Sequence, residues 1–112
     1  MTTLWHNPRC SQSRQALALL AGNGHLPDIR LYLTDSPSQE EIQSAIDTLG
    51  ISPPQLIRRS EGVYKEIGLK GASDGALIAA MATHPILIER PIVFHNGRAA
   101  IGRPPEAVLN LF

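Results

Sequence analysis

The chain has a single cysteine, Cys10, among its 112 residues, and this scarcity limits the sulfur chemistry that it can perform. One cysteine cannot form an internal disulfide, so structural disulfide bridges are excluded. Any redox role must therefore use a second thiol from another molecule.

The sequence also lacks a long apolar run, since no stretch reaches the roughly 18 residues that a membrane-spanning helix needs. Residues 1–6 do not have the basic start and apolar run of a signal peptide. We expect a soluble, cytoplasmic protein with no membrane partner.

Net charge is absent as well, because ten basic residues balance ten acidic ones. A neutral chain has no overall field that favours nucleic acid or an anionic membrane, so neither is an expected partner. The basic residues are eight arginines and two lysines, Lys65 and Lys70. Arginine binds oxyanions through its planar, bidentate guanidinium, although an arginine-rich composition without such a role gives the same count.

The length of 112 residues suits one domain, 1–112. Periodicity, capping and turn signals predict its elements. In chain order these are a strand at 2–6, a helix at 11–21, a strand at 27–33, helices at 39–49, 53–59, 63–66 and 73–82, strands at 91–94 and 99–101, and a helix that opens at 103–106 and runs to 111.

This order is typical of an α/β, thioredoxin-like fold. The opening strand, helix and strand require a parallel pair, while the turn at Asn96-Gly97 requires an antiparallel hairpin. We therefore predict a mixed four-stranded sheet with a helical insertion at about 38–83.

Cys10 ends the loop after the first strand, at the N-terminus of the first helix. The helix dipole, together with Arg9 and Arg14, favours a thiolate over the thiol, whose usual pKa of about 8.5 leaves little anion at neutral pH. A buried, inert cysteine is the alternative, but the polar neighbours of Cys10 favour the reactive one. We expect Asn7 to shape the loop.

Two known thiol motifs are absent. A Cys-x-x-Cys pair would need a second cysteine where Ser13 stands, and the phosphatase loop Cys-x5-Arg would need an arginine where Ala16 stands. An oxyanion must therefore be bound by arginines from elsewhere in the chain.

The segment His6-Asn7-Pro8-Arg9-Cys10-Ser11-Gln12-Ser13-Arg14 resembles the His-Asn-Pro-x-Cys-x-x-Ser-Arg opening of the glutaredoxin-dependent arsenate reductases. Four further segments resemble that family in order and spacing, so that the resemblance covers essentially the whole chain. They are residues 56–59, 64–69, 84–93 and 102–106.

The resemblance implies a thioredoxin-like domain with Cys10 as the nucleophile and His6 as the residue that tunes it. It further implies that three arginines bind the oxyanion and that Arg14 and Ser13 stabilise the thiolate. The three are Arg58, Arg90 and Arg103. From the residues alone, each arginine also has a structural explanation as a surface or helix-start charge, and His6 could simply fill a strand position.

By the scheme of that family, Cys10 attacks arsenate, glutathione acts as co-substrate while arsenic is reduced, and glutaredoxin resolves the mixed disulfide. No tightly bound cofactor is implied, and the histidines lack companions at metal-ligand spacing, so no metal is expected. The resemblance also suggests a cis peptide bond at Arg90-Pro91.

Two alternatives stay open. The substrate could be a similar oxyanion or a mixed disulfide in another glutathione-linked thiol oxidoreductase, because the chain stops at Phe112 without the charged tail of the longer arsenate reductases. The chain could also be a non-enzymatic, Spx-like regulator that binds RNA polymerase, although such regulators usually have Cys-x-x-Cys near the start.

Overall fold

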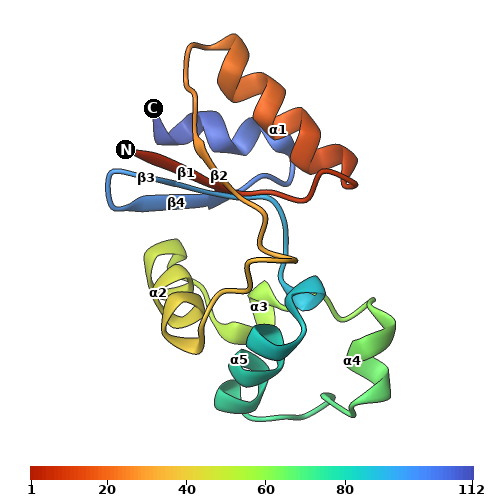
Figure 1. Cartoon of the computed structure of the whole chain (residues 1–112). Helices are drawn as coiled ribbons and strands as arrows, with labels where there is room; N and C mark the ends of the chain where they lie inside the picture. The colour runs from red at the N-terminus through yellow and green to blue at the C-terminus, as the bar shows by residue number, and fades with distance from the viewer. The chain divides into compact units, whose positions relative to one another are not determined.

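The computed structural model describes all residues, 1–112, and divides them into two compact units. The sheet unit comprises Met1–Asp35 and Arg90–Phe112, and the helical unit comprises Ser36–Glu89 (Figure 1). The predicted insertion at 38–83 lies within the helical unit, and the single-domain assignment stays a prediction.

The sheet unit contains the four predicted strands in one mixed sheet of order β2-β1-β3-β4. The strands are β1 (Thr2–Trp5), β2 (Asp28–Arg30), β3 (Ile92–His95) and β4 (Arg98–Ile101). β1 pairs in parallel with β2 and antiparallel with β3, and β3 pairs antiparallel with β4. This sheet confirms the thioredoxin-like fold.

Helix α1 (Ser11–Gly22) and the 3₁₀ helix η2 (Pro105–Leu111) pack on one another and cover one face of this sheet (Figure 1). Leu4 and Val93 are directly paired across β1 and β3, so they point to the same face, where they meet the helices. The buried core of this face consists of Leu4, Ala16, Leu20, Val93, Val108 and Leu111.

The last helix is a 3₁₀ helix rather than an α-helix, a distinction that the sequence pattern did not specify. Its buried residues, Pro105, Val108 and Leu111, recur every third position. A helix with three residues per turn keeps such a set on one side, whereas an α-helix rotates it away from the core.

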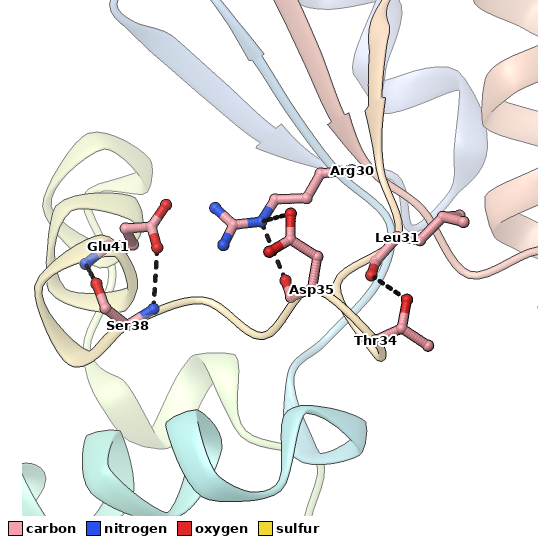
Figure 2. A network of polar contacts seen from close by, with 6 residues as sticks. All are labelled: Arg30, Leu31, Thr34, Asp35, Ser38 and Glu41. Carbon is pink, nitrogen blue, oxygen red and sulfur yellow. Dashed lines mark hydrogen bonds and ion pairs between the residues drawn. The ribbon is translucent and has the colours of Figure 1, made fainter.

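Strand β2 is shorter than the predicted 27–33 because a turn begins at Leu31. The carbonyl of Leu31 accepts hydrogen bonds from the Asp35 amide at 2.8 Å and from Thr34 Oγ1 at 3.2 Å. Arg30 Nε lies 3.3 Å from Asp35 Oδ2 across the same turn (Figure 2). These local bonds compete with further strand pairing and end the strand at Arg30.

The helical unit contains four α-helices and one 3₁₀ helix. They are α2 (Gln39–Leu49), α3 (Pro53–Leu56), α4 (Gly62–Glu66), α5 (Asp74–Thr83) and η1 (Pro85–Leu87). The predicted capping box is present at the start of α2, where Ser38 Oγ accepts from the Glu41 amide and Glu41 Oε1 accepts from the Ser38 amide (Figure 2). None of the helices has the length and apolar character needed to span a membrane.

Candidate active site

Cys10 lies between β1 and α1, where its backbone caps the helix. Its extended conformation and the 3.0 Å bond from the Arg14 amide to its carbonyl place it at the N-cap of α1. Asn7 shapes the preceding loop from both sides. Its side-chain Oδ1 accepts from the Arg9 amide at 3.0 Å, and its carbonyl accepts from the Cys10 amide at 3.0 Å. The loop therefore holds a partly exposed thiol at the end of a helix.

The pKa of the Cys10 thiol is lowered from its usual value by two kinds of group. Partial burial raises the pKa, but this is outweighed by the backbone amide of Ser13, the positive charge of Arg90, the backbone amide of Gln12 and a hydrogen bond from the Arg90 side chain. Both amides belong to the first turn of α1, whose N–H groups have no partner within the helix. The site therefore favours the thiolate, which is the nucleophilic form of cysteine.

His6 and Ser13 form a buried pair behind the cysteine loop. Ser13 Oγ lies 2.7 Å from His6 Nδ1 and also accepts from the Asn7 amide at 3.1 Å. Burial and the charge of Arg14 lower the pKa of His6, so the imidazole is held neutral at neutral pH.

Arg14 is exposed and donates from Nη1 to the Pro8 carbonyl at 2.8 Å, which ties α1 to the loop. Its charge acts on His6, whereas the charge that lowers the pKa of Cys10 belongs to Arg90. The thiolate-stabilising role expected for Arg14 stays a prediction, as do the roles expected for His6 and for the Ser13 side chain.

Arg90 and Arg103 flank a close backbone contact in the sheet unit, between Pro91 and Gly102, which we call the joint. The Gly102 amide donates to the Pro91 carbonyl at 2.9 Å, and these residues directly adjoin the two arginines in sequence. Both Arg90-Pro91 and Arg103-Pro104 are cis peptide bonds, the first of which the family resemblance suggests. Arg90 thus approaches the sulfur from a segment 80 positions away in the chain, while Arg103 is exposed.

Arg58 lies in the helical unit, where its guanidinium contacts two carboxylates. Nη2 is 3.5 Å from Glu61 Oε2, Nε is 3.8 Å from Glu89 Oε1, and Nη1 donates to the Ile86 carbonyl at 3.2 Å. The structure therefore shows Arg58 bound within its own unit, and its expected oxyanion-binding role stays a prediction.

Gly102 is a site residue that the sequence pattern did not reveal. A Cβ atom at this position would lie 2.6 Å from Pro91 Cγ and 3.2 Å from Val108 Cγ1, so only glycine fits the joint beside Arg90. A glycine after a strand gives no signal of this closeness, because it depends on packing between distant segments. A contribution from the helix-end amides was expected, but the sequence did not single out those of Gln12 and Ser13, since any residue type supplies an amide.

The arrangement places a thiol of lowered pKa, a guanidinium and two helix-end amides within one small region. Such a site can attack an electrophilic centre and stabilise negative charge on its oxygens. No three histidine, cysteine, aspartate or glutamate side chains are grouped to hold a metal ion.

Comparisons with known proteins match the chain over nearly its full length. The model of the ArsC family matches residues 5–111. The uncharacterized protein YfgD of Escherichia coli K12 is 46% identical over 96% of this chain and 93% of its own length. The arsenate reductase of Haemophilus influenzae is 44% identical over 96% of both chains.

A solved structure gives the same result. The arsenate reductase from Vibrio cholerae superposes with a TM-score of 0.96 at 48% sequence identity, covering 99% of this chain and 97% of that one. The similarity therefore extends through both compact units and includes the cysteine loop.

Proposed function

Because the chain belongs to the ArsC family, we propose that it reduces arsenate to arsenite with Cys10 as the nucleophile. The observation that carries this proposal is the lowered pKa of the Cys10 thiol beside the Arg90 guanidinium. Relatives named as arsenate reductases, at 42–44% identity over nearly the full chain, support the choice of substrate.

In the first step, the Cys10 thiolate attacks the arsenic atom. A sulfur–arsenic bond forms, and one arsenate oxygen leaves as water after protonation. We assign to Arg90, whose side chain hydrogen-bonds to the Cys10 sulfur, the task of binding the arsenate oxygens and offsetting the charge of the transition state. We assign the same task to Arg103 and Arg58, as the family resemblance implies.

Reduction of arsenic from the +5 to the +3 state needs two electrons, and oxidation of two thiols to a disulfide supplies two. The chain has only one cysteine, so the second thiol must come from another molecule. We assign it to glutathione: its sulfur bonds to Cys10 Sγ, the sulfur–arsenic bond breaks with its electron pair left on arsenic, and arsenite departs. The product on the protein is a mixed disulfide of Cys10 and glutathione, and we assign its resolution to glutaredoxin.

The test is consumption of NADPH by the pure protein with arsenate, glutathione, glutathione reductase and glutaredoxin. We expect turnover that requires arsenate and glutathione, falls when glutaredoxin is omitted, and disappears in Cys10→Ser. We expect Cys10→Ser to keep the fold, because the substitution changes one atom of a partly exposed side chain. Circular dichroism of the variant checks this.

Turnover that persists in Cys10→Ser would contradict the proposed nucleophile. No turnover of the folded wild-type protein, with Cys10 still reactive toward an alkylating reagent, would contradict arsenate as the substrate. Turnover with arsenate and glutathione that is unchanged without glutaredoxin would contradict only the assigned resolving step.

A further inference from the structure

The helical unit has a hollow of about 390 Å³. Cys10 and the residues next to it in sequence do not line it. Its lining comes from one continuous stretch, residues 59–70, which contains α4. The volume lies within the range of about 300–1,000 Å³ that is typical of pockets for small molecules.

Three cationic side chains line this hollow: Arg59, Lys65 and Lys70. The two lysines are the only lysines of the protein, whose total charge is zero. All three residues are exposed, and none of them takes part in an ion pair. Each of the three cations is therefore available to a ligand without the loss of an existing ion pair.

Glu61 is the one acidic residue of the lining, and its charge is already offset. Its Oε2 lies 3.5 Å from Arg58 Nη2, and Arg58 is not a lining residue. The lining thus has three cations against one paired carboxylate, and one further carboxylate, Glu66, lies beside the lining residue Gly62. Clustered charge of one sign in a concave surface concentrates ions of the opposite sign.

Beside the cations, the hollow has an apolar wall formed by Leu69 and Tyr64. Leu69 is buried and Tyr64 is half-buried. A second hollow, of about 260 Å³, is lined by four of the same residues: Arg59, Tyr64, Leu69 and Lys70. The two hollows share this wall, so a ligand with a carbon frame has apolar surface to contact in either one.

We propose that this hollow binds a small organic anion that carries two or more carboxylate or phosphate groups. The lysine ammonium groups act as point charges toward either kind of group, and the Arg59 guanidinium can bind either in a bidentate manner. Several anionic groups on one molecule match several cations, while the apolar wall accepts the carbon frame.

The experiment is a titration of the isotope-labelled Cys10→Ser protein, followed through its backbone amide NMR signals. Pyrophosphate probes the phosphate class, citrate probes the carboxylate class, and acetate is the single-anion comparison. We expect pyrophosphate or citrate to shift the amide signals of Gly62 and Gly68, which line the hollow, and acetate to have little effect at the same concentration. The probe that binds more tightly shows whether the hollow prefers phosphate groups or carboxylate groups.

Lys65→Gln and Lys70→Gln are each expected to weaken this binding by roughly 2- to 5-fold, the range of single exposed charge pairs. Arg98→Gln is the matched control, because Arg98 is an exposed cation in the sheet unit and does not line the hollow. It should leave the affinity unchanged.

Shifts confined to the amides of residues 11–13, or equal weakening by Arg98→Gln, would overturn the proposal. So would the absence of shifts with both multivalent anions. The readout needs neither arsenate nor the Cys10 thiol, so its failure is distinct from a failure of the proposed reductase activity.

Discussion

The joint between Gly102 and Pro91 makes a sharp prediction for Gly102→Ala. The added Cβ would lie 2.6 Å from Pro91 Cγ, whereas carbon atoms in good contact are about 3.5–4.0 Å apart. The pair must separate by roughly 1 Å, and overpacking of this kind costs about 1–3 kcal/mol. For a chain of this size, the middle of that range lowers the melting temperature by roughly 8 °C.

The assay is thermal unfolding of Gly102→Ala beside Gly75→Ala. Gly75 lies in the first turn of α5, where an added Cβ would have no heavy atom within 4 Å, so alanine there should be neutral or stabilise by up to about 1 kcal/mol. Because the displaced Pro91 directly follows Arg90, Gly102→Ala should also raise the pKa of Cys10. Unchanged melting of Gly102→Ala, or an equal loss in Gly75→Ala, would refute the reasoning.

Two further predictions concern the charges around the cysteine loop. Arg90→Gln removes a positive charge and a hydrogen bond from the sulfur, so it should raise the pKa of Cys10 and slow its alkylation at neutral pH. Arg14→Gln should change that rate little. If Arg14→Gln slows alkylation more than Arg90→Gln does, Arg14 is the main stabiliser of the thiolate. The pKa of His6 is lowered below 6.5 in the folded protein, so the unfolded chain binds more protons and stability should fall as the pH drops from 6.5 toward the folded value. Urea unfolding at several pH values should show this slope in the wild type and a smaller one in His6→Gln, and identical slopes would show that another group causes it.

The fold was largely predictable because its signals are local. The capping box at Ser38, the turn at Asn96-Gly97 and the apolar periodicity of α1 and α2 each depend on residues within a few positions of one another. The predicted length of the second strand, 27–33, was wrong because two local signals compete there. The alternating residues favour a strand, but the turn at Leu31 takes up the backbone hydrogen bonds that a longer strand would need.

The candidate site was predictable only in its local half. The position of Cys10 at a helix N-terminus follows from the breaker at Pro8 and the helix that starts at Ser11. The proximity of Arg90 does not follow from any local pattern, because the folded sheet brings a segment 80 residues away to the sulfur. For that arginine, only the family resemblance pointed to the site. Gly102 lies in one of the segments that resemble the family, but nothing in the sequence indicated its close packing against Pro91.

The two halves of the site contribute differently to the reactivity of Cys10. The amides of Ser13 and Gln12 are backbone groups that remain in place as long as α1 keeps its first turn. Most side-chain substitutions at these positions therefore leave their effect on Cys10 unchanged. The Arg90 contribution comes from a side chain next to the hydrogen bond between Gly102 and Pro91. It can be altered by a substitution of Arg90 or by a substitution of Gly102 that disturbs the packing against Pro91. The amides at the helix end and the Arg90 guanidinium therefore lower the pKa of Cys10 by separate routes, and only the second depends on the fit of Gly102 against Pro91.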